Sequence, residues 1–222
     1  MKFLFLSLTA SILFLTTGCS HQNTSNSDTI QASISGSQNA TYKLTFTAIM
    51  DETVSAGTHL TKFVGVMHKT PGIFWIPGGY ATEGLRLIAE RGQQPTAINE
   101  LTEVIASGDA ESLLIAPIHI YHPANTQNPS EFITTFNVTK AHPYLSLASM
   151  IGPSPDWFVG VYNELLVQNG EFISSANFIL YAYEAGTKNK NPHIPIARST
   201  NPAISHIIYG TLKLEKQFFT QL

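Results

Sequence analysis

Two carboxylates in this sequence are candidates for a functional site. Asp156 follows two prolines in Gly-Pro-Ser-Pro-Asp-Trp-Phe-Val-Gly-Val, and Glu184 precedes a glycine turn in Leu-Tyr-Ala-Tyr-Glu-Ala-Gly-Thr. Each acid lies beside a strand-like run, so we expect the two side chains to meet on loops at one end of a sheet structure. Hard cations such as Ca²⁺ are bound by carboxylate clusters of this kind. The alternative for Asp156 is to cap its own turn through the backbone.

The eight histidines do not point to a catalytic or metal site. His119 and His122 would lie on opposite faces of a strand, and the remaining histidines are scattered in a way typical of loop and surface residues. The sequence has no Gly-x-Ser-x-Gly elbow, phosphate-binding glycine loop or dinucleotide fingerprint. We therefore predict that the chain is not an enzyme.

The elements that must position these residues are mostly strands. Tyr42, Leu44 and Phe46 alternate with polar residues, which predicts a strand with one apolar face and one wet face. The same period of two returns at Phe136 and Val138, at Leu145 and Leu147, and at Leu212 and Leu214. The nearly continuous apolar run 113–120 predicts a strand covered on both faces.

Two helices are predicted between the first strands and this apolar run. In the first, Leu85, Ile88 and Ala89 share a face and Gly92 ends the helix. The second begins near Pro95 and ends at Gly108. Many short strands with one helical insertion predict an antiparallel β-sandwich whose helices pack at an end or an edge.

Composition limits the classes of function. The chain has 222 residues, of which 43% are hydrophobic and 12% are charged, and its net charge is −3. These values favour a single globular domain and exclude a disordered chain. Twelve Lys and Arg residues give no polycationic surface, so we expect no nucleic-acid partner. A single cysteine excludes an internal disulfide framework and a thiolate metal cluster.

The N-terminus predicts export. Lys2 is followed by an apolar run up to Leu15, which is shorter than a membrane-spanning helix and typical of a signal peptide, here residues 1–18. Cys19 directly after Gly18 resembles a bacterial lipobox, which implies a lipid on Cys19. Residues 19–40 are polar and small, as in a flexible tether. We therefore expect a lipid-anchored protein of the bacterial cell envelope, in the outer membrane if the source is Gram-negative, with a folded domain at 41–222.

Several motifs in order carry a family resemblance. The Pro-Ser-Pro-Asp-Trp-Phe-Val-Gly-Val and Leu-Tyr-Ala-Tyr-Glu-Ala-Gly-Thr motifs, the helical stretch Gly79–Gly92 and the segment Leu145–Met150 together resemble the spondin-type domain, the amino-terminal module of F-spondin, in its bacterial lipoprotein branch. The resemblance runs from about Tyr42 to Leu214. It implies a C2-like antiparallel β-sandwich with a short two-helix insertion, acting in adhesion or recognition.

The resemblance also implies a divalent cation, Ca²⁺ or another, held mainly by acids at one end of the sandwich. On this sequence the corresponding positions are Asp156, Glu184 and Asn137, and a further family acid is replaced by Lys188. Calcium affinity falls as ligand charge is removed. Two alternatives therefore remain: a weakened cation site, or a metal-free site in which the Lys188 ammonium takes the place of the cation.

Three functions are compatible with these features. The first is a non-enzymatic recognition or adhesion module that binds a glycan or an extracellular or envelope protein and meets the membrane only through its lipid. The second is a structural subunit of an envelope assembly with a metal-free site. The third, a cation-dependent hydrolase with His142 or His193 as base, lacks a spacing that would fix either histidine beside the acids.

Overall fold

The computed structural model describes residues 37–188 and 194–218. All of these residues belong to one compact unit, Ser35–Leu222. The predicted signal peptide, the lipid on Cys19 and the tether up to residue 36 lie outside the described residues. None of the described helices is long and apolar enough to cross a membrane.

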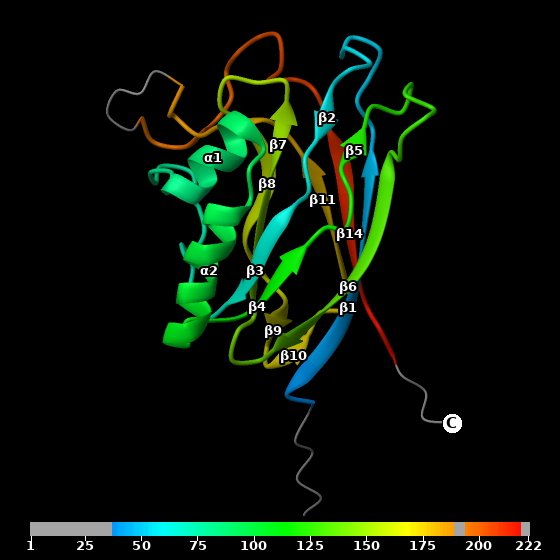
Figure 1. Cartoon of the computed structure of the whole chain (residues 1–222). Coiled ribbons are helices and arrows are strands. Elements are labelled where there is room, and N and C mark those ends of the chain that lie inside the picture. The colour runs from blue at the N-terminus through cyan, green and yellow to red at the C-terminus, as the bar shows by residue number, and fades with distance from the viewer. Residues whose placement is uncertain (1–36, 189–193, 219–222) are drawn as a thin grey trace, which may run out of the picture. The chain divides into compact units, whose positions relative to one another are not determined.

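A four-stranded antiparallel sheet forms one layer of this unit (Figure 1). Its strands, in spatial order, are β11 (Ser175–Leu180), β14 (Gly210–Lys216), β1 (Asn39–Ala48) and β6 (Glu131–Thr139). The predicted alternation in β1 is confirmed, because Tyr42, Leu44 and Phe46 are buried while the residues between them are partly exposed. One face of this sheet is therefore core and the other faces solvent.

An eight-stranded sheet forms the second layer. Its main path is β13 (Ala197–Arg198), β12 (Tyr183–Glu184), β8 (Trp157–Leu165), β7 (Tyr144–Gly152), β2 (His59–Leu60) and β5 (Ile120–Tyr121). Beside β2, β7 also pairs with β3 (Val64–His68), and β3 pairs with β4 (Ala110–Ile115). A separate small hairpin is made of β9 (Val167–Gln168) and β10 (Glu171–Phe172).

The two sheets enclose the larger hydrophobic core, to which β1, β6, β7, β8 and β14 all contribute. This arrangement confirms the predicted antiparallel β-sandwich. Aromatic side chains fill its centre, where the rings of Phe46, Phe63 and Phe132 lie with centroids 5.1–5.7 Å apart.

Both predicted helices are confirmed. Helix α1 (Glu83–Arg91) begins after Thr82, whose hydroxyl accepts a hydrogen bond from the amide of Leu85, and ends at Gly92 with φ of 64°. Helix α2 (Pro95–Ser107) has proline in its first turn and ends at Gly108 with φ of 82°. Glycine is suited to both C-terminal positions because they require a left-handed backbone.

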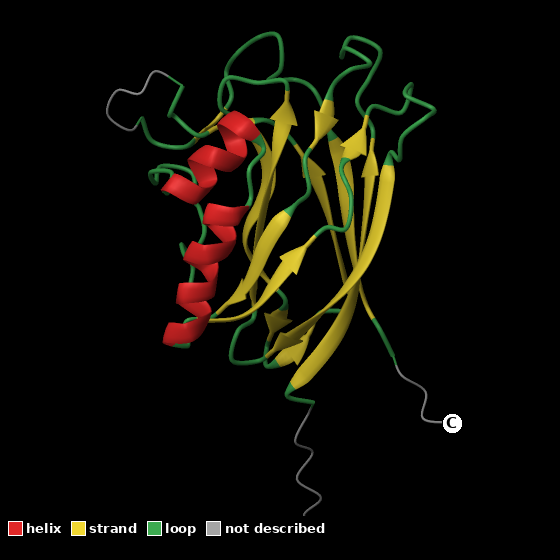
Figure 2. Cartoon of the chain, in the orientation of Figure 1, coloured by secondary structure: helices red, strands yellow, loops and turns green. Residues whose placement is uncertain are grey.

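The prediction that the helices pack at an end or an edge is wrong. Figure 2 shows both helices on the outer side of the larger sheet, away from the smaller sheet. Helix α1 contacts β7 and β8, and α2 contacts β3 and β4. Together they enclose a second hydrophobic core that includes Leu85, Ile88 and Leu101. The layer order is therefore helices, eight-stranded sheet, four-stranded sheet.

This layer order changes which strands are covered on both faces. Strands β3 and β7 lie between two layers, and every residue of β7 after Tyr144 is buried. The alternation at Leu145 and Leu147 therefore does not mark a wet face. The prediction of a doubly covered strand over 113–120 is wrong, because β4 ends at Ile115, which is 44% exposed, and Leu113 is only partly buried.

Candidate functional site

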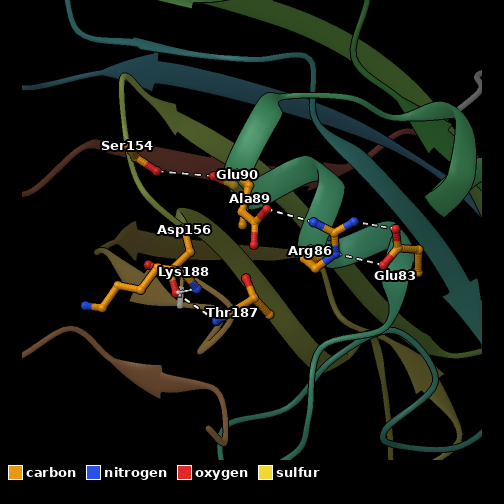
Figure 3. Close-up of polar contacts among 8 residues, drawn as sticks. All are labelled: Glu83, Arg86, Ala89, Glu90, Ser154, Asp156, Thr187 and Lys188. Carbon is orange, nitrogen blue, oxygen red and sulfur yellow. Dashed lines mark hydrogen bonds and ion pairs between the residues drawn. The ribbon is translucent and has the colours of Figure 1, made fainter. Parts of the chain in front are cut away.

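The loop between β7 and β8 is fixed to helix α1. The hydroxyl of Ser154 accepts a hydrogen bond from the amide of Trp157 (2.7 Å). It also donates one to the carbonyl oxygen of Ala89 (3.2 Å), which Figure 3 shows. A serine hydroxyl that caps a backbone amide three residues later is a common feature of tight turns. Ser154 thus stabilises the turn that carries Asp156 and also ties it to helix α1.

Asp156 is completely buried and caps the turn that follows β12. Its Oδ2 accepts hydrogen bonds from the backbone amides of Thr187 (3.0 Å) and Lys188 (3.3 Å). Its own carbonyl oxygen accepts from the amide of Ala185 (3.0 Å). Asp156 therefore caps a turn that lies about thirty residues further along the chain, and the two predicted motifs meet through this carboxylate.

The second carboxylate oxygen has no such partner. Among the described residues, three buried side-chain atoms lack a hydrogen-bond partner: Asp156 Oδ1, Thr187 Oγ1 and Trp157 Nε1. A buried polar atom left unsatisfied costs about 1–3 kcal/mol. The three unsatisfied atoms belong to the two motifs that meet at Asp156, and the two oxygens belong to residues already joined by a hydrogen bond. The unsatisfied oxygens of Asp156 and Thr187 would each suit a further polar partner, such as a cation or a water molecule.

Glu184 lies next to this turn but its carboxylate has other partners. Its Oε1 accepts a hydrogen bond from the hydroxyl of Ser199 (2.7 Å), and its Oε2 lies 3.5 Å from the ammonium of Lys188. Glu184 pairs across the sheet with Trp157, which packs against the core between the sheets. Because cross-strand partners share a face, we infer that the Glu184 side chain faces that same side.

Lys188 contacts the two acids in different ways. Its backbone amide binds Asp156, whereas its ammonium pairs with Glu184. Figure 3 shows the Lys188 side chain extending away from the Asp156 carboxylate. The ammonium therefore neutralises Glu184 and leaves the unsatisfied oxygen of Asp156 without a cation from this side chain.

Asn137, the third predicted ligand, lies in the other sheet. It is on β6, where its Oδ1 accepts a hydrogen bond from the hydroxyl of Thr41 (2.8 Å). The end of β6 leads into the start of β7, whereas the loop with Asp156 follows the end of β7. A nine-residue strand is about 30 Å long. The structure therefore places the segments of Asp156 and Glu184 side by side, with the two carboxylates bound to different partners, and leaves Asn137 near the opposite end of the sandwich.

The acids and histidines do not assemble into a larger cluster. Within 37–188 and 194–218, no group of three or more His, Cys, Asp or Glu side chains could hold a metal ion. His142 lies at the far end, where it contacts Thr139 and lies 3.6 Å from Glu111. His193 falls outside the described residues. The hydrolase arrangement with His142 beside Asp156 is therefore not formed.

Three residues of the site were missed in the sequence. Thr187 and Ser154 belong to the two motifs, and the spacing Ser-x-x-Trp could have predicted the cap that Ser154 makes. Ser199, which binds Glu184, had no local signal because it comes from a separate strand end.

Comparison with known proteins points to one family. The family model described as Spondin_N matches residues 40–216. Human Spondin-2 is 30% identical over 156 residues, which cover 67% of this chain and 46% of the human protein. Mouse Spondin-1 is 28% identical over 158 residues, which cover 67% of this chain and 19% of the mouse protein. The chain thus spans less than half the length of these curated relatives.

Proposed function

The chain belongs to the Spondin_N family, and from this premise we propose that it is a non-enzymatic recognition or adhesion module of the bacterial cell envelope. Its ligand is a glycan or an extracellular or envelope protein. The observation that carries the proposal is the buried polar turn at Asp156, where the two motifs that resemble the family meet. A folded domain with a rigid, loop-bearing end is suited to present a binding surface.

We further propose that this end binds a hard divalent cation such as Ca²⁺. The carboxylate of Asp156 and the hydroxyl of Thr187 supply oxygen atoms that are buried and lack partners, and oxygen is the ligand atom that Ca²⁺ prefers. Glu184 would join them only after leaving Ser199 and Lys188. Asn137 is not part of this proposed set, because it lies near the other end of the sandwich. The bound cation would add positive charge to the recognition surface.

A melting experiment tests the cation. The full chain is heated in EDTA and then in rising Ca²⁺, and the midpoint of unfolding is recorded. A ligand of the native state stabilises by about 2.7 kcal/mol at a hundredfold excess over Kd. We expect a saturable rise that is lost in Asp156→Asn and kept in Asn137→Ala. No rise, or an equal rise in Asp156→Asn, would remove Ca²⁺ from the proposal.

The Lys188 position gives a second test of the same site. Lys188→Asp removes the cation from Glu184 and adds a carboxylate beside the turn that Asp156 caps. Added ligand charge raises Ca²⁺ affinity, so we expect tighter binding in calcium titration calorimetry. An unchanged affinity would mean that residue 188 does not reach the cation.

Anchoring through Cys19 is part of the proposal. The matching experiment is detergent-phase partition of the full chain and of Cys19→Ser, which we expect to leave the detergent phase. An unchanged partition would contradict the lipid anchor.

The second candidate is a structural subunit of an envelope assembly with a metal-free site. The ion pair between Lys188 and Glu184 favours it, because the pair already neutralises one of the two acids. Capture from detergent-solubilised membranes separates the two candidates. A stoichiometric protein partner favours the assembly, whereas capture of soluble glycans favours recognition.

A further inference from the structure

Strand β8 has a long edge that lacks a neighbouring strand. Among the described residues, its partner on the side away from β7 is β12, a two-residue strand that pairs with Trp157 and Phe158. From Val159 to Leu165, no strand in the described part of the chain pairs with this side of β8. Half of the backbone amides and carbonyls of an antiparallel strand point to each side. This stretch therefore offers backbone hydrogen-bonding groups to an incoming strand.

A groove of about 350 Å³ lies along this edge, between β8 and the edge strand β11 of the other sheet. Gly160, Tyr162 and Glu164 of β8 line it, with Phe178 and Ile179 of β11 and Tyr183 of β12. Tyr162 is 40% and Ile179 is 53% exposed. The groove is thus partly apolar and open to solvent.

The aromatic wall of the groove packs on a buried tryptophan. The rings of Tyr162 and Tyr183 each lie 5.0 Å from the ring of Trp75, and 6.4 Å from each other. Trp75 is buried and donates a hydrogen bond to the carbonyl oxygen of Leu147. Trp75 therefore packs against both tyrosine rings from inside the protein. Exposed tyrosine faces attract ammonium and guanidinium groups.

Glu164 supplies the only charge among the residues that line the groove. The backbone at Asn163 has φ of 52° and the strand register shifts there, so Glu164 pairs with Leu145, which points into the core between the sheets. Glu164 therefore faces the side on which β11 lies. Within the described chain its carboxylate has no ion pair or hydrogen bond, unlike Glu83, Glu90 and Glu215, and burial raises its pKa. A half-buried, unpaired carboxylate is stabilised strongly by a cation.

We propose that this groove binds an extended peptide segment of a partner protein, which pairs with the free edge of β8 and places a lysine or arginine against Glu164. A strand added to a sheet edge gains affinity from backbone hydrogen bonds and specificity from side-chain pockets. The tyrosine faces and the carboxylate fit a cationic group on an aliphatic stem, whereas a neutral glycan would leave Glu164 unpaired. The inference rests on the recognition function proposed above, but it uses a different surface from the turn at Asp156.

The probe is a pair of peptides that differ only in charge. The heptapeptide acetyl-Thr-Val-Thr-Lys-Thr-Val-Thr-amide is titrated into the ¹⁵N-labelled full chain, followed by the same peptide with norleucine in place of lysine. We expect the amide signals of 159–165 and 175–180 to move, and the lysine peptide to bind about tenfold more tightly, as for one charge-assisted hydrogen bond. No movement of these signals, or equal affinities, would overturn the proposal.

A variant pair assigns the effect to Glu164. Glu164→Gln keeps the shape and removes the charge, so the lysine peptide should fall to the affinity of the norleucine peptide. Glu103→Gln on the exposed side of α2 is the matched control and should change nothing. In Glu164→Lys, a peptide with glutamate at the centre should bind better than the lysine peptide, which keeps the test valid if Glu164→Gln is less stable.

Other outcomes identify other occupants. If a soluble oligosaccharide moves the same signals and the lysine peptide does not, the groove is a glycan site and the proposal fails. If the signals broaden with protein concentration alone, the occupant is a second copy. Loss of Ca²⁺ binding in Asp156→Asn with unchanged peptide binding would separate this surface from the cation site.

Discussion

Asp156, on the loop between β7 and β8, and His68, at the end of β3, are both completely buried polar side chains, yet their hydrogen bonding differs. His68 Nδ1 donates to the carbonyl oxygen of Thr70 (2.7 Å), and its Nε2 accepts from the hydroxyl of Ser146 (2.9 Å). This pattern fits a neutral imidazole with both nitrogens satisfied. At Asp156 one oxygen binds two amides and the other has no partner among the described residues.

This difference in hydrogen bonding indicates a structural role for His68 and a candidate ligand-binding role for Asp156. The His68 network is closed, since Ser146 also accepts from the amide of Asn163 (2.9 Å) and no buried atom remains for a ligand. A closed network of this kind fixes the packing of β3 against β7 and β8. The Asp156 turn is open and has a place for a further polar partner. Although a serine beside a histidine is also found in hydrolases, burial of both residues leaves no access for a substrate.

The largest expected effect is on the Asp156 turn. Asp156→Ala removes the acceptor of two backbone amides, and we expect the free energy of unfolding to fall by about 3 kcal/mol, since bonds to charged groups are strong and the amides stay buried. Urea unfolding of the full chain in EDTA measures it. The matched control is Thr187→Val, which removes an unsatisfied hydroxyl and should change stability by less than about 1 kcal/mol. A larger loss in Thr187→Val than in Asp156→Ala would contradict the description of the turn.

Loss of the Ser146 hydroxyl, which lies at the centre of the His68 network, should destabilise the protein. Ser146→Ala removes one bond to His68 and one to the amide of Asn163, so we expect a loss of about 2 kcal/mol in urea unfolding. Ca²⁺ should have the same effect on this variant as on the original chain. If Ser146→Ala abolished the calcium response, the two buried sites would be coupled and the comparison would fail.

As the pH is lowered, protonation of His68 should destabilise the protein at a higher pH than protonation of the carboxylates. Burial lowers the pKa of His68, the hydrogen bond to Thr70 opposes this, and His142 lowers it further. Below about pH 6.5 the unfolded chain therefore binds a proton that the folded chain resists, and stability falls as the pH falls, by up to about 1.4 kcal/mol per pH unit.

Urea unfolding at pH 7.5, 6.5 and 5.5 measures this dependence, with His68→Gln as the test variant. Burial also lowers the pKa of His119 and acts with the same sign, so the series is run in a His119→Asn background. The lowered pKa values of Asp51, Glu83 and Glu215 act at more acidic pH. An equal slope with and without His68 would refute the role given to this residue.

The fold was predictable where burial on one face leaves a periodic pattern. Strand β1 alternates because one of its faces is wet, and α1 and α2 carry caps that local chemistry requires. The covering of β7 by the helices was not predictable, because serines such as Ser146 and Ser149 are typical of a solvent-exposed strand face. Their hydroxyls are instead satisfied inside the protein, by His68 and by the carbonyl oxygen of Thr61. The polarity of a residue does not tell whether water or a distant segment of the chain will be its hydrogen-bond partner.

The site was predictable to the extent that its motifs are local. Asp156 and Glu184 were expected at one end of the sheet, and their strands do pair there. The partners of each acid depend on which residues of other segments reach it, and Ser199 had no signal of its own. Asn137 was assigned from its position before the Pro-Ser-Pro-Asp motif, but an upstream strand can lie in either sheet and run in either direction. Order along the chain alone cannot decide between these arrangements.

The smallest expected effect concerns the ion pair beside the open turn. Lys188 and Glu184 have side chains that are 40% and 26% exposed, and pairs of this kind contribute less than about 1 kcal/mol. Lys188→Ala removes the ammonium but keeps the backbone amide that binds Asp156, so urea unfolding should show little change, whereas Asp156→Ala shows a large one. The same variant frees Glu184 from its cation and should raise Ca²⁺ affinity slightly in calorimetry. A loss as large as that of Asp156→Ala would mean that the ammonium, rather than the amide, holds the turn.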